Sequence, residues 1–235
     1  MPDHFEIYRS RAADYERLVA REDHEGRILP ALEAIVPLAA LDVVEFGSGT
    51  GRLSCLLAPR VASISAFDIS AHMLEVAAAR LRRAGLGNWR TEVADHRRVP
   101  APDGAAGLAI AGWSVCYLVT WEPERWRAEV DRALAEMRRV LRPGGTAVLL
   151  ETLGTGREEP EAPAPLTAYY DHLAQHGYAR TWIRTDYRFA DRSEAEELVR
   201  FFFGEEMTAR LAARDGAVTL PECTGIWWQR LPASP

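Results

Sequence analysis

Apolar positions along the chain recur with two different periods, and each period predicts a type of secondary structure. Apolar residues spaced three and four apart predict helices, whereas short apolar or alternating runs predict strands. We expect helices over residues 5–20, 23–36, 52–58, 71–83, 122–141, 166–176 and 193–214. We expect strands over residues 43–46, 61–67, 89–94, 106–112, 146–151, 180–189 and 223–230.

The predicted strands and helices alternate between residues 43 and 151, and this alternation indicates the fold class. Such a pattern is typical of an α/β protein with a doubly wound, mostly parallel sheet and right-handed crossovers. The continuous apolar run over residues 106–112 fits a strand that is covered on both faces. Ligands of these sheets bind outside the carboxyl ends of the strands.

The chain is organised around residues 41–58, which read LDVVEFGSGTGRLSCLLA. A short apolar strand is followed by Gly47, Gly49 and Gly51, and then by a helix that Pro59 ends. Glycine adopts positive φ angles easily and lets the backbone approach a ligand closely. The amide groups at the start of the helix also carry partial positive charge. This stretch therefore predicts a binding site for a small molecule.

Three further candidate contacts follow other predicted strands. Asp68 lies about twenty residues beyond the glycine turn, which is the position of an acidic residue that binds ribose hydroxyls. Asp95 follows the third strand and Gly112 ends the fourth. Because the carboxyl ends of parallel strands meet at one edge, we expect these residues to lie on the same rim as Gly47.

Composition narrows the function further. The 235 residues carry a net charge of −6 without a basic stripe, so no nucleic acid partner is expected. No run reaches the ~18 apolar residues of a membrane span, and the first residues lack the apolar core of a signal peptide. Three widely spaced cysteines indicate free thiols, and together these features predict a cytoplasmic protein without a membrane partner.

The chain contains no lysine, so all 28 basic residues are arginine. Enzymes that form a Schiff base need a lysine amine, and P-loop nucleotidases need the Gly-Lys pair of their phosphate-binding loop. Both classes are excluded. A nicotinamide-dependent oxidoreductase remains an alternative, although Arg52 is large for the third small residue of a dinucleotide fingerprint.

The motifs VVEFGSGTGRL, AFDIS, VADHRRVP and MRRVLRPGGTAVLLE resemble those of class I S-adenosylmethionine-dependent methyltransferases of the bacterial small-molecule type. The resemblance covers residues 41–230. It implies a Rossmann-like, seven-stranded sheet whose last strand is antiparallel, S-adenosyl-L-methionine as cofactor and S-adenosyl-L-homocysteine as product. A non-catalytic protein that binds the same cofactor remains a further alternative.

The resemblance also implies roles for individual residues. Glu45 and the glycine turn would hold the methionine end of the cofactor, Asp68 the ribose, and Asp95 the adenine amino group. Ile69, Met73 and His96 would lie near the adenine, and the fourth strand would lie beneath the methyl group. With Tyr15 of the N-terminal segment, the expected cofactor-binding residues are Tyr15, Glu45, Gly47, Ser48, Gly49, Gly51, Asp68, Ile69, Met73, Asp95, His96, Ala111, Gly112 and Trp113.

The acceptor is expected to be a small molecule, bound by the segments that the family uses for this purpose: residues 1–36, 152–176 and 190–215. We expect one domain over residues 1–235, with an N-terminal helical cap or lid (1–36), a cofactor-binding core (41–151) and a substrate-side region (152–235). Candidates for a catalytic role are His24, Tyr15, Tyr117 and His172. The spacing of histidines and carboxylates predicts no metal site, and the oligomeric state is left open.

Overall fold

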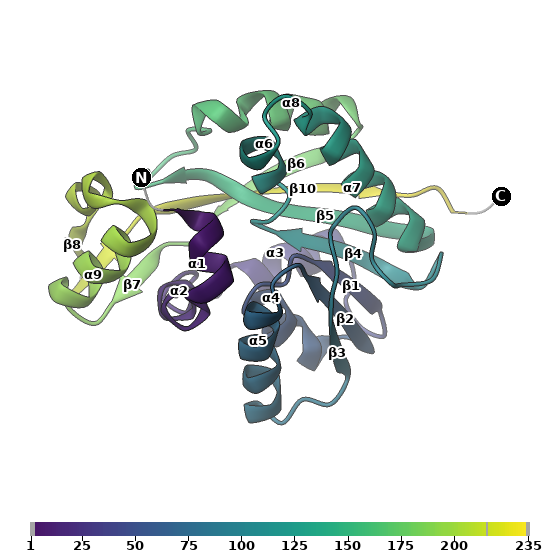
Figure 1. Ribbon diagram of the computed structural model, residues 1–235, viewed down its shortest axis with the longest axis horizontal. Helices are drawn as coiled ribbons and strands as arrows, with labels where there is room; N and C mark the ends of the chain where they lie inside the picture. Colours follow the sequence, from purple (N-terminus) through teal and green to yellow (C-terminus); the bar gives the residue numbers. More distant parts are fainter. Residues whose placement is uncertain (1–2, 215, 234–235) are drawn as a thin grey trace.

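The computed structural model describes residues 3–214 and 216–233. Its centre is a seven-stranded sheet in the order β3-β2-β1-β4-β5-β10-β6, shown in Figure 1. The strands of this sheet are β1 (Asp42–Phe46), β2 (Ser63–Asp68), β3 (Trp89–Val93), β4 (Ala106–Gly112), β5 (Leu141–Thr155), β6 (Ala179–Arg184) and β10 (Glu222–Arg230). Strand β10 pairs antiparallel with both β5 and β6, and the pairs among β1–β5 are parallel. The predicted α/β fold with an antiparallel last strand is confirmed.

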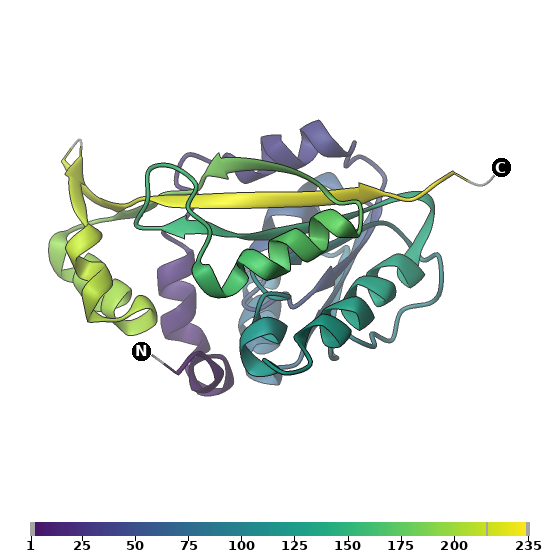
Figure 2. The ribbon, with the colours of Figure 1, turned by 90° about the horizontal axis from the view of Figure 1, so that it is seen from above.

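Helices cover both faces of the sheet, as the apolar run of β4 predicts. Alternate residues of that strand point to opposite sides, Leu108 and Ile110 toward one helical layer and Ala109 and Ala111 toward the other. One layer contains α3 (Ile28–Ile35), α4 (Arg52–Leu57) and α5 (Ala71–Arg83). The other contains α6 (Tyr117–Trp121), α7 (Trp126–Val140) and α8 (Thr167–Gln175), which Figures 1 and 2 show together on their side of the sheet.

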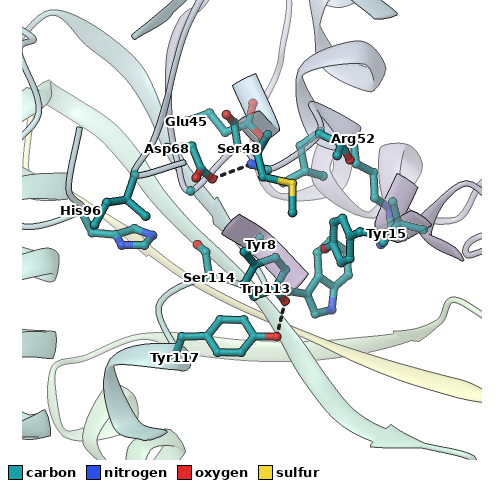
Figure 3. A pocket seen from close by; sticks show the side chains of 18 of the residues that line it. Tyr8, Tyr15, Glu45, Ser48, Arg52, Asp68, His96, Trp113, Ser114 and Tyr117 are labelled. Atoms are coloured by element: carbon teal, nitrogen blue, oxygen red, sulfur yellow. Dashed lines mark hydrogen bonds between the residues drawn. The ribbon is translucent and has the colours of Figure 1, made fainter. Parts of the chain in front are cut away.

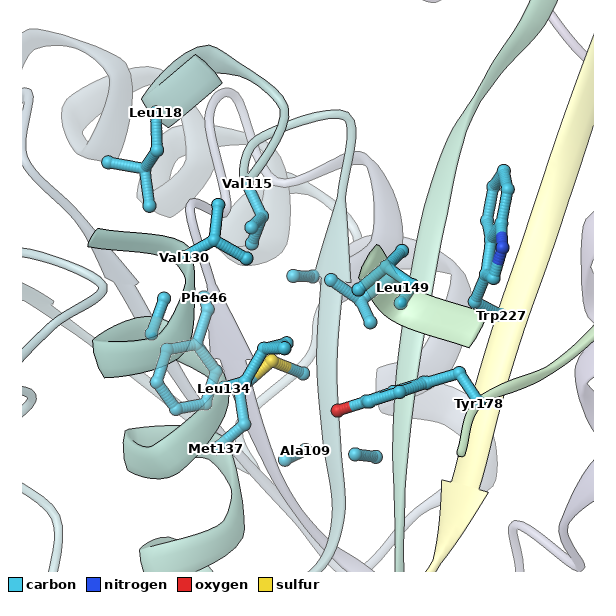
Figure 4. Close-up of a cluster of buried hydrophobic side chains, with 14 of the residues drawn as sticks. Phe46, Ala109, Val115, Leu118, Val130, Leu134, Met137, Leu149, Tyr178 and Trp227 are labelled. Atoms are coloured by element: carbon cyan, nitrogen blue, oxygen red, sulfur yellow. The ribbon is translucent and has the colours of Figure 1, made fainter. Parts of the chain in front are cut away.

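The larger of the two hydrophobic layers forms beneath α7. Val130, Leu134 and Met137 recur at helical spacing on its inner face and are fully buried. Figure 4 shows them packed against Phe46 and Leu149 from strands β1 and β5. Ala109 of β4 belongs to the same cluster, so this packing fixes the strands that precede the glycine turn and Trp113.

The N-terminal segment forms α1 (His4–Ser10) and α2 (Ala12–Val19) instead of the single helix predicted over residues 5–20. The helix breaks at Arg11, whose φ of −120° and ψ of 33° are not helical. The break brings the rings of Tyr8 and Tyr15 together at a centroid distance of 5.3 Å. With α3, the segment confirms the predicted helices before the first strand.

Two predictions for the C-terminal part were wrong. Residues 180–189 do not form one strand, because β6 ends at Arg184 and β7 (Tyr187–Phe189) joins a second sheet with β8 (Ala212–Arg214) and β9 (Ala217–Leu220). The predicted helix over 193–214 also stops early. It consists of α9 (Arg192–Phe203), which Gly204 ends at a φ of 92°, and a 3-10 turn over Glu205–Arg210.

The reason for the first break lies between the two sheets. The amide of Thr185 donates to the Glu222 carbonyl, and Asp186 accepts from the Glu222 amide at 3.0 Å. Asp186 is also held by Arg184 at 2.8 Å. These bonds hold the chain at Glu222, where β10 begins, and the residues of β7 then pair with β9 instead. With this second sheet, α9 lies beside α1 and α2 at one end of the molecule (Figures 1 and 2).

Two further observations concern composition. Among residues 3–214 and 216–233, no helix combines the length and the apolar character that a membrane crossing requires. The three cysteines, Cys55, Cys116 and Cys223, are free thiols, as the spacing predicts.

Candidate functional site

The glycine turn after β1 brings the backbone against two side chains. Gly47 has a φ of 66°, and a methyl group added there would lie 2.5 Å from Ser114 Cβ and 2.6 Å from His96 Nε2. Gly49, at a φ of 53°, faces the ring of Tyr15. Both glycines line a cavity at the rim of the sheet, as expected. Gly51 instead packs against Ala77 of α5, so its role is to seat α4 on its neighbour.

Asp68, the last residue of β2, is tied to the glycine turn. Its Oδ2 accepts from the Gly49 amide and its Oδ1 from the Ser70 amide, both at 2.8 Å. Burial raises the pKa of Asp68 against the lowering effect of these two bonds. Each carboxylate oxygen can accept a second hydrogen bond, and Asp68 lines the cavity, so it could accept from a pair of ribose hydroxyls.

Other polar atoms of this cavity have no partner. His96 Nε2 and Ser48 Oγ are buried and make no hydrogen bond with any described residue. Burial also lowers the pKa of His96, so its ring is held neutral beside Asp68. Buried polar atoms are rarely left unpaired. These atoms surround a glycine turn that leaves no room for a side chain at Gly47. The arrangement indicates a polar ligand and fits an adenosylmethionine cofactor.

Glu45 lies under the turn, at the inner end of the cavity. It is 2% exposed and accepts from the Ser54 hydroxyl. Burial raises its pKa to about 8. A protonated Glu45 offers the cavity both a hydrogen-bond donor and an acceptor. It would therefore interact with the ammonium and carboxylate groups of a methionyl ligand through hydrogen bonds more than through charge.

Trp113 is held in an unfavourable backbone conformation. Its φ of 48° is rare for a bulky residue, and such strain gathers at functional sites. The Trp113 amide donates to the Leu150 carbonyl at 2.6 Å. Its ring lies 4.2 Å from the guanidinium carbon of Arg52, which is paired in turn with Glu22 at 2.6 Å. The indole therefore stands on the cavity wall between β4 and the N-terminal helices.

The N-terminal helices close the cavity through Tyr8. Its hydroxyl is hydrogen bonded to that of Tyr117, as the dashed line in Figure 3 shows. The Tyr8 carbonyl accepts from the Ser70 hydroxyl at 2.8 Å. Burial raises the pKa values of Tyr8 and Tyr117 well above those of ordinary tyrosines. Both phenols therefore stay protonated and act as hydrogen-bond donors and acceptors. Helix α1 is thus fastened to both α5 and α6.

The rim cavity contains most of the residues expected to bind the cofactor. Those that line it are Tyr15, Glu45, Gly47, Ser48, Gly49, Asp68, Ile69, Met73, His96, Gly112 and Trp113. Ala111 is fully buried beneath the wall. Asp95 does not line the cavity either: Arg97 takes both of its carboxylate oxygens, at 2.7 and 2.5 Å. Burial by itself would raise the pKa of Asp95, but Arg97 holds it below the usual range.

A second cavity of about 520 Å³ adjoins the first, and we call it the aromatic chamber. Its walls come from all three segments expected to bind the acceptor. Seven residues line both cavities: Tyr8, Tyr15, Val19, Arg52, Trp113, Tyr117 and Trp121. Further rings come from Phe5, Tyr187, Phe202 and Phe203. The chamber ends in the polar side chains of Glu22, Thr152, Thr155 and Glu222.

The four catalytic candidates separate into two groups. Tyr15 and Tyr117 lie at the boundary of the two cavities. His24 lies in a polar surface pocket beside Arg184 and Asp186, outside both. His172 lies on α8 and contacts Asp131 of α7 at 2.7 Å. The structure thus brings two of the candidates to the site and places both histidines elsewhere.

One group of possible metal ligands was not expected. His172 and His176 both contact Asp131, at 2.7 and 2.9 Å, and the three ligand atoms lie within 4.8 Å of one another. Two imidazole nitrogens and a carboxylate oxygen could hold a divalent cation. The signal in the sequence is the spacing of four between the histidines, which places them on one side of a helix.

The sequence analysis missed other residues of the two cavities. Ser114 and Trp121 follow the fourth strand, where the same rim argument would have found them. The chamber also brings together residues that are up to 200 positions apart in the sequence: Glu22, Arg52 and Glu222. No local sequence pattern predicts that they lie close together.

Comparison with known proteins agrees with this geometry. Residues 43–145, which span β1 to the start of β5, match the family model of a methyltransferase domain. The chain carries a class I S-adenosylmethionine-dependent methyltransferase domain. This domain includes the glycine turn, Asp68 and Trp113. The match favours the methyltransferase family over the alternative of a nicotinamide-dependent oxidoreductase.

Curated relatives of the methyltransferase domain act on different acceptors. A malonyl-[acyl-carrier protein] O-methyltransferase of Geobacter sulfurreducens is 34% identical over 192 residues, 78% of this chain and 62% of its own. A ubiquinone/menaquinone biosynthesis C-methyltransferase of Bordetella avium is 33% identical over 127 residues, 53% of this chain and 45% of its own. The chain thus spans about half to three fifths of the length of such relatives.

Solved structures share the fold at low sequence identity. The YcgJ protein from Bacillus subtilis matches with a TM-score of 0.61 at 14% identity, covering 90% of this chain and 100% of its own. A SAM dependent methyltransferase from Aquifex aeolicus matches with a TM-score of 0.53 at 14% identity, covering 85% and 87%. These likenesses concern the arrangement of the sheet and helices.

Proposed function

We propose that the protein transfers a methyl group from S-adenosylmethionine to a small-molecule acceptor. The observation that carries the proposal is the junction of the two cavities. The rim cavity has the features of a cofactor site, and the aromatic chamber opens from it across Tyr8, Trp113 and Tyr117. A non-catalytic cofactor-binding protein would need no second cavity at this place.

When bound, the cofactor supplies a methyl group already activated on a sulfonium, so the protein's main task is to position the acceptor and exclude water. Asp68 would hold the ribose hydroxyls, with Ile69 and Met73 against the adenine. The backbone of Gly47 and Gly49 would border the methionine end. These residues all line the rim cavity.

Residues at the junction would orient the acceptor. Tyr8, Tyr15 and Tyr117 have pKa values raised by burial, so they donate hydrogen bonds and do not serve as phenolate bases. Trp113 borders both ligands and separates them from the protein interior. The candidates His24 and His172 lie outside both cavities, whereas His96 lines the rim cavity and His4 the chamber. We propose that rate enhancement comes mainly from proximity and orientation, which supplies ~7–11 kcal/mol at best.

Two measurements test the proposal. Isothermal titration with S-adenosylhomocysteine and with NAD should give binding of the first alone. Release of S-adenosylhomocysteine from S-adenosylmethionine, followed across a panel of small acceptors, should rise with at least one of them. Cofactor binding without turnover of any acceptor would favour the non-catalytic alternative, and no binding would refute both.

A further inference from the structure

The polar end of the aromatic chamber is built around Glu22, and this carboxylate is fully paired. Its Oε2 accepts from Arg52 Nη1 at 2.6 Å and from the Tyr187 hydroxyl at 2.8 Å. Its Oε1 accepts from the Thr185 hydroxyl at 3.1 Å. Glu22 and Arg52 therefore form a buried ion pair, although Arg52 Nη2 makes no hydrogen bond with any residue that the structure describes.

Glu222 also lines this end of the chamber but, unlike Glu22, has one carboxyl oxygen without a hydrogen-bond partner. It is 2% exposed, and its Oε1 accepts from the Thr152 hydroxyl at 2.7 Å. Its Oε2 is buried and makes no hydrogen bond with any residue that the structure describes. A buried carboxyl oxygen without a partner costs stability, and native proteins rarely keep one without a reason. Because Glu222 lines the chamber, a ligand group can supply the missing partner.

The charges around the chamber decide which group this is. Its described lining includes the carboxyl groups of Asp3, Glu22 and Glu222, together with Arg52 and the imidazole of His4. Arg52 is already paired with Glu22 and stacked on Trp113. Burial raises the pKa of Glu222 to about 8, and a cation beside this carboxyl group would favour its ionised form, whereas an anion would disfavour it.

The aromatic walls favour the same sign of charge. The faces of Tyr and Trp rings attract cations, most strongly in a site that excludes water. Tyr117 and Trp121 stack at a centroid distance of 4.9 Å, and Tyr8 meets Tyr117 edge-on at 5.2 Å. Phe202 lies 5.4 Å from the ring of Tyr15 and stacks at 4.5 Å on His4, whose ring meets Tyr117 edge-on.

We propose that the aromatic chamber binds a protonated amine carried on an apolar body, with the nitrogen on Glu222 Oε2 and the body against the aromatic side chains that line the chamber, Tyr117, Trp121 and Phe202 among them. The inference rests on the proposed function, because it names the class of molecule that would be the acceptor. It concerns recognition by this chain's own residues and is tested by binding alone.

Three probes that share a phenylethyl body test the proposal: 2-phenylethylamine, 2-phenylethanol and 3-phenylpropanoate. Each is titrated calorimetrically into the 235-residue chain, with and without saturating S-adenosylhomocysteine. We expect the amine to bind about tenfold or more tightly than the alcohol, and the carboxylate to bind weakest. Equal affinities, tighter binding of the carboxylate, or no amine binding up to about 10 mM would overturn the proposal.

A variant locates the contact. Glu222→Gln should lower the affinity for the amine about tenfold and leave that for the alcohol within about twofold. Glu206→Gln is the matched control, since Glu206 is exposed and outside the chamber. Retention of the amine preference by Glu222→Gln would contradict the assignment. If this variant does not fold, the ranking of the three probes on the unaltered protein still decides.

The result can be separated from the proposed function. Titration of S-adenosylhomocysteine into the same protein tests the cofactor site independently of the chamber. Failure of that titration refutes the methyltransferase proposal, while the ranking of the probes without cofactor still reports on Glu222. Cofactor binding together with equal probe affinities refutes only the amine assignment.

Discussion

The two cavities of this protein meet at one wall but are built in different ways. The rim cavity is formed mainly by residues 45–53, 68–73, 96 and 112–114, each set following directly on a strand of the parallel sheet. The aromatic chamber is assembled from α1, α2, the end of β5, α9 and the start of β10, which lie far apart in the sequence. The first depends on short motifs, and the second depends on how distant segments pack.

This difference suggests that the rim cavity tolerates few changes, whereas the chamber can vary without loss of the fold. The glycine turn is fixed by positive φ angles and close contacts. The chamber walls are helices and loops attached to the edge of the sheet. Variants in each region can break or sharpen this contrast.

The largest effect is expected for Gly47→Ala. Its Cβ would lie 2.5 Å from Ser114 Cβ, and the φ of 66° is strained for alanine. We expect a loss of roughly 2–4 kcal/mol in the free energy of unfolding, together with loss of S-adenosylhomocysteine binding. Gly85→Ala is the matched control, because its φ is 70° and no atom lies within 4 Å of its added Cβ. Urea denaturation should show about 1 kcal/mol for the control. Equal losses in both would mean that the turn is not closely packed.

Asp68→Ala should have the next largest effect. It removes the acceptor for the Gly49 amide and the proposed partner of the ribose, so we expect affinity for S-adenosylhomocysteine to fall by about 1–3 kcal/mol. Asp95→Ala serves as the comparison, since Arg97 occupies that carboxylate outside the cavity. Calorimetric titration of S-adenosylhomocysteine into both variants shows which of the two carboxylates contributes more to cofactor affinity. A larger loss for Asp95→Ala would restore the adenine contact that the family resemblance implies.

A smaller effect is expected at Glu151, behind the junction. Burial raises its pKa to about 7, while its Oε1 accepts from the Cys116 amide and the Tyr169 hydroxyl. The folded state therefore keeps this proton to a higher pH than the unfolded chain, whose glutamate has its ordinary pKa. Stability must fall as the pH rises from about 4.5 to 7.

Glu151→Gln keeps the hydrogen-bonding shape but cannot ionise. We expect the variant to gain roughly 1–2 kcal/mol relative to the unaltered protein between pH 5 and pH 8, measured by urea denaturation at both values. Glu45 and Glu222, whose pKa values are raised to about 8 for the same reason, should preserve part of the pH dependence. An identical pH profile in the two proteins would show that Glu151 ionises normally in the fold.

The smallest effect on the cofactor is expected for Phe202→Ala. The ring lines the chamber and not the rim cavity. Affinity for S-adenosylhomocysteine should therefore stay within about twofold, while affinity for 2-phenylethylamine should fall, both by calorimetry. A large loss of cofactor affinity would show that the two cavities are not separable from this side.

The sequence predicted the local parts of the structure well, for a physical reason. Asp68, Gly47 and Gly112 were found because each ends or follows a strand, and parallel strands bring such positions to one rim. Strand β4 was placed over residues 106–112, as observed, because it is apolar at both faces. The Ser70 side chain caps α5 by accepting from the Met73 amide, which its position before the helix predicts.

What could not be predicted depends on contacts between distant residues. Alternation over residues 180–189 is compatible with one strand, and only the hydrogen bonds of Thr185 and Asp186 to Glu222 divide it. The short strand β8 has three exposed residues and no apolar pattern to reveal it. Asp95 follows β3 much as Asp68 ends β2, but Arg97, two residues later, occupies both oxygens of its carboxylate, and Asp95 does not line the rim cavity.

Helix α1 has a consequence for how this protein can diverge or be engineered. Tyr8 is a wall of both cavities and is fastened to Tyr117 and to Ser70. A substitution of Tyr8 that enlarges the chamber would also alter the cofactor site. A gain in acceptor binding would then come with a loss in cofactor binding. Phe202, Phe203 and Leu166 line the chamber alone. Substitutions intended to change the acceptor preference should therefore be made first at these positions. Helix α1, which forms part of the wall between the two cavities, should be left unchanged.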